Sequence, residues 1–161
     1  MDFESVYEAH FQAVYRFLLS LCRNHALAEE LTQETFVRAM NHWQDYRGQC
    51  APQTWLISIA KNVYFSHRRR EKRRLPGDQD PAVFDYPEAD MERRELIERA
   101  HRALHGLPEP YREVFSLRAF AELSYAQIAA LFGKSEVWGR VTYFRARVML
   151  QEAMKGEEGN E

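Results

Sequence analysis

Residues 123–136 read Leu-Ser-Tyr-Ala-Gln-Ile-Ala-Ala-Leu-Phe-Gly-Lys-Ser-Glu, and this stretch decides the fold of the C-terminal part of the chain. Ser124 and Gln127 form a capping box, in which each side chain bonds a free backbone N–H at the start of a helix. Gly133 ends that helix, because glycine accepts left-handed backbone geometry. Ser135 then caps a long helix that runs to about residue 154. Two helices joined by a short turn that contains glycine predict a helix-turn-helix.

The rest of the chain also has helical spacing, because apolar residues recur at steps of three and four while strict alternation is rare. We predict helices at about residues 3–23, 26–43 and 52–74, the last beginning with Pro52, whose missing N–H is tolerated in a first turn. Further helices are expected from about residue 88 onward. The sequence therefore predicts an all-α protein.

Residues 75–90 are the best candidate for a domain boundary, since they hold three prolines, one glycine and several aspartates. We predict two small helical domains, at residues 1–74 and 91–155. A flexible acidic linker at 75–90 joins them, and a tail at 156–161 follows. The second domain is the helix-turn-helix domain.

Charge is distributed unevenly along the 161 residues, although the formal net charge is only −2. Residues 61–74 contain seven Lys or Arg against one acid, and residues 78–98 contain eight Asp or Glu against two Arg. Because salt screens charges beyond about 8 Å, each patch acts locally. The basic run therefore indicates a nucleic-acid contact that the net charge does not reveal.

The sequence gives few signs of a membrane protein or an enzyme. No apolar run reaches the length of a membrane span, and a secretory signal is absent, so we expect a cytoplasmic protein with reduced Cys22 and Cys50. The spacing Cys22-x-x-His25 is half of a zinc site without a second half, so no metal is expected. Without a nucleophile–base pattern or a phosphate-binding glycine loop, we predict no cofactor and no catalysis.

Three helical segments carry candidate binding residues. Arg140, Arg145 and Arg147 in the last helix suit phosphates or guanine in a major groove, and the alternative is a hairpin with a solvated basic face. Aromatic residues beside the basic run, among them Tyr46 and Trp55, suit single-stranded DNA. The alternative is a solvated helix end with Trp55 in the core, which we favour for Trp55 itself. Polar residues at 29–38 form an outward face, for which periodicity favours plain solvation over partner docking.

Taken in order, several segments resemble extracytoplasmic-function (ECF) sigma factors of RNA polymerase. Residues 28–40 (AEELTQETFVRAM) resemble the polymerase-binding segment of that family. Residues 46–48 (YRG) and 54–62 (TWLISIAKN), followed by the arginine run, resemble the segment that binds the minus-ten promoter element. Residues 107–115 and 123–129 resemble the second domain, which binds the minus-thirty-five element.

The resemblance implies a subunit that directs core RNA polymerase to promoters and helps to melt the minus-ten region. Its partners would be core polymerase, promoter DNA as duplex and as melted strand, and an anti-sigma factor, often membrane-linked in this family. The implied polymerase contacts are Glu30, Gln33, Glu34 and Arg38. The implied minus-ten contacts are Tyr46, Arg47, Asn62, Arg68, Arg69 and Arg70. The implied minus-thirty-five contacts are Arg140, Val141, Phe144, Arg145 and Arg147.

The last helix departs from the family pattern at Trp138-Gly139, which leaves its register open between two apolar stripes. We favour the stripe of Gly139, Tyr143, Ala146 and Leu150 as buried, over that of Val137, Val141, Phe144 and Val148, because it leaves Arg140 and Arg145 outward. A glycine inside a helix costs about 1 kcal/mol against alanine, so Gly139 indicates close packing or a close approach of DNA.

The rival functions are a dimeric regulator that acts independently of polymerase, and a nuclease.

Overall fold

The computed structural model describes residues 2–74 and 90–158, which form seven α-helices and one 3-10 helix and contain no strand. The predicted all-α fold class is confirmed. The chain divides into two compact units, residues 1–83 and 84–161, and each is described by itself. Most of the predicted linker, residues 75–89, and the last three residues of the predicted tail lie outside the described residues.

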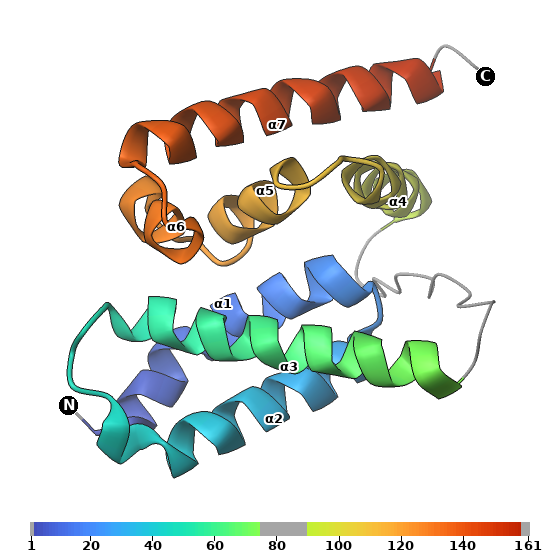
Figure 1. Ribbon diagram of the computed structural model, residues 1–161. Coiled ribbons are helices and arrows are strands. Elements are labelled where there is room, and N and C mark those ends of the chain that lie inside the picture. Colours follow the sequence, from blue (N-terminus) through green and yellow to red (C-terminus); the bar gives the residue numbers. More distant parts are fainter. Residues whose placement is uncertain (1, 75–89, 159–161) are drawn as a thin grey trace. The chain divides into compact units, whose positions relative to one another are not determined.

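The N-terminal unit contains α1 (Phe3–Cys22), α2 (His25–Asn41), the 3-10 helix η1 (Trp43–Asp45) and α3 (Pro52–Arg74), with the three long helices packed together (Figure 1). Asp2 caps α1 by accepting a bond from the backbone N–H of Ser5 at 2.9 Å. Asn24 caps α2 in the same way through Leu27, at 3.0 Å. These short polar side chains supply acceptors that the first helical turn lacks.

The core of this unit is built mainly from aliphatic residues, with Phe17, Phe36 and Tyr64 also buried. Its fully buried large side chains are Val6, Val14, Phe17, Leu18, Leu31, Leu56, Ile57 and Val63. The expected position of Trp55 in the core is wrong, since this side chain is only half-buried. Tyr7 continues the apolar spacing of α1, which runs through Phe3, Tyr7 and Phe11, yet it is 41% exposed. Tyr7 in α1 and Trp55 in α3 therefore lie at the edge of the buried face of the helix and not at its centre.

The C-terminal unit contains α4 (Met91–His105), α5 (Tyr111–Ala119), α6 (Tyr125–Phe132) and α7 (Glu136–Glu158) (Figure 1). Both halves of the predicted capping box at Ser124 and Gln127 are present, and Gly133 ends α6 with φ of 65°. Val114, Leu117, Leu123 and Ile128 are fully buried. The predicted helix-turn-helix is confirmed, and α7 continues to Glu158, beyond the expected end near residue 154.

Candidate functional site

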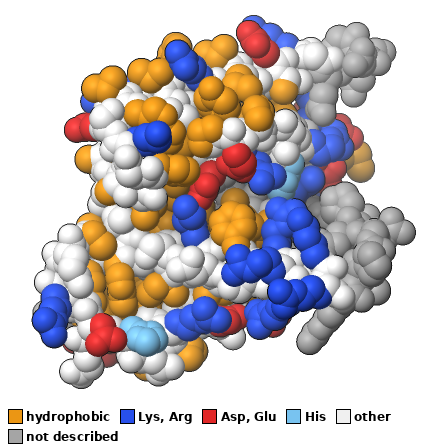
Figure 2. Space-filling view, viewed as in Figure 1, with side chains coloured by type: hydrophobic (Ala, Val, Ile, Leu, Met, Phe, Trp, Pro, Cys, Tyr) orange, Lys and Arg blue, Asp and Glu red, His pale blue; other side chains and the backbone are white. Residues whose placement is uncertain are grey.

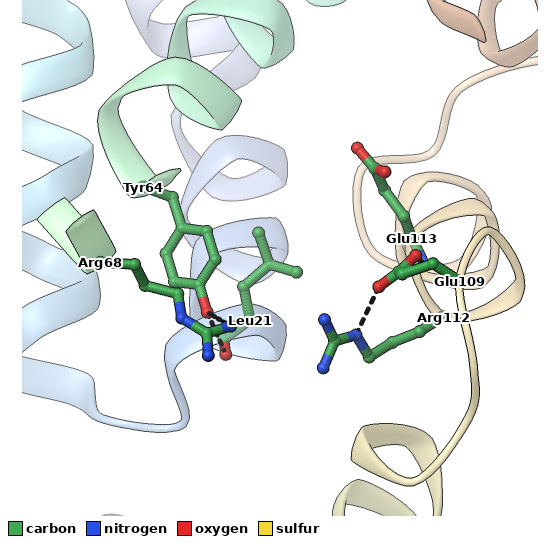
Figure 3. A network of polar contacts seen from close by, with 6 residues as sticks. All are labelled: Leu21, Tyr64, Arg68, Glu109, Arg112 and Glu113. Atoms are coloured by element: carbon green, nitrogen blue, oxygen red, sulfur yellow. Dashed lines mark hydrogen bonds and ion pairs between the residues drawn. The ribbon is translucent and has the colours of Figure 1, made fainter. Parts of the chain in front are cut away.

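The arginine-rich end of α3 is anchored to α1 through a tyrosine. The Tyr64 hydroxyl donates to the carbonyl of Leu21 at 3.2 Å, and the Arg68 guanidinium donates to the same hydroxyl at 3.5 Å (Figure 3). Arg69 donates to the Ser66 hydroxyl at 3.2 Å and is exposed, as is Arg70. Figure 2 shows Lys and Arg side chains gathered around the C-terminal half of α3. Tyr64 therefore ties α3 to α1 one turn before the arginines, and the end of α3 beyond it offers a positive surface.

Three aromatic rings fix the segment between α2 and α3. Tyr46 stacks on Trp43 with 5.4 Å between ring centroids and lies 5.0 Å from Trp55. The Tyr46 hydroxyl donates to the carbonyl of Cys50 at 2.5 Å, and burial raises the pKa of this hydroxyl. Arg47 is exposed in the same segment, and its backbone N–H donates to the Gln49 side chain at 2.9 Å. Tyr46 therefore shapes the loop as well as offering part of its ring at the surface.

Asn62 lies exposed on α3, two helical turns beyond Trp55. Its neighbours along the chain are Lys61, which is half-buried, and Val63, which is fully buried. The amide of Asn62 is thus presented to solvent between the aromatic cluster and the arginines. Amide groups of this kind can bond the edge of an unpaired base, because they offer a donor and an acceptor together.

The outward face of α2 carries the residues implied in polymerase binding. Glu30, Gln33 and Arg38 are exposed, and Glu34 is half-buried and accepts a bond from Arg38 at 2.8 Å. Two apolar side chains lie on the same helix, Val37 at 52% and Met40 at 54% exposed. An exposed ion pair contributes little to stability, so this face is not explained by the fold alone. Exposed Met40 and Arg38 are of residue types that are enriched at protein–protein interfaces.

The register of α7 is the one that we favoured. Gly139 and Ala146 are buried and Tyr143 and Leu150 are half-buried. The rival stripe is exposed, with Val137 and Phe144 each at 63%, Val141 at 40% and Val148 at 36%. Arg140, Arg145 and Arg147 all point to solvent. The outward face of α7 therefore combines arginines with apolar side chains.

Gly139 is required by the packing of α7 on α6. A Cβ atom placed there would lie 2.9 Å from the backbone oxygen of Tyr125. Real Cβ contacts are essentially never that short, and the obstacle is backbone that cannot turn aside. The sequence suggested either close packing or a close approach of DNA as the reason for Gly139. The structure shows close packing of α7 on α6 at this residue.

The half-site Cys22-x-x-His25 is occupied by other contacts. The Cys22 thiol donates to the carbonyl of Asn24 at 3.4 Å, and burial raises its pKa to about 11. The His25 ring pairs with the Tyr15 hydroxyl at 2.8 Å. Across residues 2–74 and 90–158, no three His, Cys, Asp or Glu side chains are grouped as metal ligands. Both cysteines are free thiols.

Sequence reasoning named Tyr64 only as one of the aromatic residues beside the basic run, where the structure buries it, and did not predict the following contacts. Trp43 stacks against Tyr46, and Tyr64 anchors α3 to α1. At the start of α5, one carboxylate oxygen of Glu109 accepts a bond from Arg112 at 2.7 Å (Figure 3). The other oxygen accepts a bond from the backbone N–H of Glu113 at 3.1 Å. The spacing of Glu109 and Arg112, three residues apart, is the signal that could have revealed the last pair.

None of the helices in the described parts is long and apolar enough to cross a membrane.

Comparison with known proteins accounts for both units. The family model "Sigma-70 region 2" matches residues 6–74, and "Sigma-70, region 4" matches residues 97–150. The ECF RNA polymerase sigma factor SigM of Bacillus subtilis is 30% identical over 154 residues, which cover 94% of each chain. The chain belongs to the ECF RNA polymerase sigma factors.

Other sigma factors agree with this assignment. The RNA polymerase sigma factor YlaC of Bacillus subtilis is 29% identical over 94% of this chain and 91% of its own length. The sigma factor RpoE of Bartonella quintana, solved in complex with the anti-sigma factor NepR, matches with a TM-score of 0.79 at 25% identity, over 96% of this chain and 97% of its own. As a sigma factor, this protein binds core RNA polymerase and promoter DNA and directs the polymerase to promoters. A regulator that acts without polymerase is not favoured.

Proposed function

We propose that the two units of this sigma factor divide promoter recognition between them. The unit with α3 binds the melted minus-ten strand, and the unit with α7 reads the minus-thirty-five element as duplex. The observation that carries this proposal is the register of α7, in which Gly139 and Ala146 are buried while Arg140, Arg145 and Arg147 face solvent. A helix packed in this way presents one continuous face to a major groove.

The outward face of α7 has the groups that distinguish base pairs in a major groove. Arginine forms paired bonds to the N7 and O6 of guanine, and apolar side chains contact the methyl group of thymine. Arg140 and Arg145 would supply the first kind of contact, and Val141 and Phe144 the second. Arg147 would contact phosphate or base from the same face.

The surface on α3 has the groups that hold an unpaired strand. Arg47, Arg68, Arg69 and Arg70 would contact phosphates, and Asn62 would bond the edge of a base turned out of the stack. Turning out a base costs a few kcal/mol, which stacking and edge bonds return. Because the Tyr46 hydroxyl is already bonded to Cys50, the Tyr46 ring and not its hydroxyl would meet the base.

The exposed face of α2, with Glu30, Gln33, Glu34 and Arg38, would dock on core polymerase, and catalysis would remain with the polymerase. The protein would then act in the cytoplasm, where the polymerase is. We also propose an anti-sigma factor as a partner, because RpoE of Bartonella quintana is solved with one and because α7 exposes Val137, Val141, Phe144 and Val148. Contiguous exposed apolar side chains mark an interaction surface.

The test separates melting from upstream binding in the same holoenzyme. Run-off transcription with purified core polymerase on genomic fragments first identifies a promoter. Asn62→Ala is then expected to lower open-complex formation, measured by permanganate reactivity of the minus-ten thymines, while affinity for the upstream duplex stays within about twofold. Gln12→Ala, which removes an exposed amide from α1, is the control and should change neither. Unchanged melting in Asn62→Ala would remove Asn62 from the minus-ten site.

A further inference from the structure

Tyr125, the first residue of α6, lies between two arginines from the neighbouring helices. The guanidinium carbon of Arg118, on α5, is 4.3 Å from the centroid of the Tyr125 ring, and that of Arg140, on α7, is 5.5 Å away. Both distances are within the range of cation–π attraction, about 6 Å. Arg118 is fixed further by donating to the carbonyl of Leu123 at 3.0 Å. One ring therefore contacts a cation from α5 and another from α7.

The position of this ring relative to α7 is fixed by packing. The backbone of Tyr125 is the surface against which Gly139 fits, since a Cβ atom at Gly139 would lie 2.9 Å from the Tyr125 oxygen. The Tyr125 ring also lies 6.0 Å from the ring of Tyr143, on the buried side of α7. A shift of the α6 backbone at Tyr125 would therefore disturb its contact with α7, and the ring is limited on one side by Tyr143. The ring is thus a rigid reference point beside the outward face of α7.

Arg140 is the residue that gains from such a reference point. Its side chain is 60% exposed, and its one other described partner is Glu136, whose carboxylate oxygen lies 3.5 Å from it. A long exposed side chain loses rotamer freedom when it binds DNA, so restraining it beforehand lowers the cost of binding. An ion pair this exposed is a weak restraint, and the aromatic face adds a second one.

We propose that Tyr125 is a positioning residue, which holds the guanidinium of Arg140 in the orientation that reads the minus-thirty-five element. This inference rests on the proposed function, in which Arg140 contacts that element. The face of the ring is what acts, and the hydroxyl does not. Phenylalanine should therefore replace Tyr125 without loss, whereas an aliphatic residue of similar bulk should not.

The experiment uses the full chain in holoenzyme and, as probe, a duplex that covers the upstream part of a promoter the holoenzyme transcribes. We expect Tyr125→Leu to weaken binding by about two- to fivefold, the amount that an exposed cation–π contact supplies, and Tyr125→Phe to bind as the wild type. Selection from a pool with randomised minus-thirty-five bases should show relaxed preference at the base pair that Arg140→Ala also relaxes. Tyr111→Leu, which alters a half-buried tyrosine packed on the core of the same unit, is the control and should leave this preference unchanged.

A double-mutant cycle separates the inference from the proposed function. Tyr125→Leu should cost nothing further in an Arg140→Ala background. An equal loss in both backgrounds, or an equal loss in Tyr125→Phe, would overturn the positioning role and leave the role of Arg140 intact. If Arg140→Ala itself changed neither affinity nor preference, both the role of Arg140 and this inference would fail. Tyr125→Met, whose unbranched and flexible side chain reaches further into the space of the ring, replaces Tyr125→Leu if thermal denaturation shows that the leucine variant is unfolded.

Discussion

Helices α3 and α7 are both 23 residues long and both present arginines, but they combine packing with charge in different ways. In α3 the fully buried residues Leu56, Ile57, Ala60 and Val63 come first, and the arginines follow toward the C-terminal end. In α7 buried and exposed residues alternate around the helix, as in buried Gly139 next to exposed Arg140. Core packing and the presentation of arginines are therefore separated along the axis of α3, whereas in α7 they occupy different sides of the same stretch of helix.

This difference sets how each surface responds to mutation. A changed arginine at the end of α3 leaves the core contacts of that helix in place. A bulkier packing residue on α7 would push the helix away from its neighbour and displace the arginines, because buried and exposed residues are adjacent in the chain and only about 100° apart around the axis. The comparison predicts that binding and stability can be altered independently in α3, and that they are coupled in α7.

The largest effect is expected at Gly139. Gly139→Leu should destabilise the C-terminal unit by about 1–3 kcal/mol, since its side chain meets the backbone of Tyr125, and should abolish specific upstream binding. Gly139→Ala should cost less, because the helix propensity of alanine returns about 1 kcal/mol. Thermal denaturation and duplex binding measure the two effects.

The matched control for this change is Gly156→Ala, on the same helix. A Cβ atom there would meet nothing within 4 Å, so the variant should be neutral or slightly more stable. Equal behaviour of the two alanine variants would show that α7 tolerates displacement from α6, and the proposed coupling in α7 would be wrong.

A smaller effect is expected at Arg145. Arg145→Ala should weaken upstream duplex binding by about 1–3 kcal/mol if it contacts a guanine, with no change in thermal stability because the side chain is exposed. Lys155→Ala, which removes an exposed charge from the end of the same helix, is the control. Equal losses on promoter and random duplex would assign Arg145 to phosphate instead.

A still smaller effect on affinity is expected from the exposed arginines of α3. The double change of Arg69 and Arg70 to alanine should reduce the salt dependence of binding to a minus-ten single strand by about 1.4 in logarithmic slope. The melting temperature should not change, since both side chains lie beyond the buried part of the helix. Arg16→Ala, an exposed arginine on α1, controls for net charge. A lowered melting temperature would contradict the separation along α3.

The smallest effect of the Arg69 and Arg70 change is expected on the reactivity of Cys22, the last residue of α1, which follows the Leu21 that Tyr64 of α3 contacts. Burial raises the pKa of this thiol to about 11, so at pH 8 about one thiol in a thousand is ionised. Its alkylation rate should rise about tenfold per pH unit up to that pKa, and exposed Cys50 should react first. The Arg69 and Arg70 variant should leave the Cys22 rate unchanged. Faster labelling would show that the arginine end supports the core.

The sequence was sufficient to predict features set by local chemistry. The capping box at Ser124, the left-handed stop at Gly133 and the start of α3 at Pro52 depend only on residues within a turn of each other. The register of α7 also followed, because only one of its two stripes left the arginines outward. The candidate residues on α7 could therefore be placed on one face from the residue pattern alone.

Features set by contacts between helices were beyond prediction from sequence. Periodicity gives the direction of an apolar stripe but not its edges, so the half-exposed positions of Tyr7 and Trp55 could not be predicted. The bond from Tyr64 to Leu21 joins residues 43 positions apart. The contact of Tyr125 with Arg140 depends on how closely α6 approaches α7, which Gly139 permits but does not specify.

The turn at Gly133 has a consequence for which substitutions the motif can accept over time. Its φ of 65° is left-handed, yet a Cβ atom there would meet nothing within 4 Å, so the constraint concerns backbone angle and not space. Asparagine, which tolerates that angle better than other side chains, should be an acceptable replacement. A saturation library should therefore recover Gly133→Asn among active variants, while side chains larger than alanine should be lost at position 139. The residues tolerated at position 133 would therefore be limited by backbone angle, and those tolerated at position 139 by the size of the side chain.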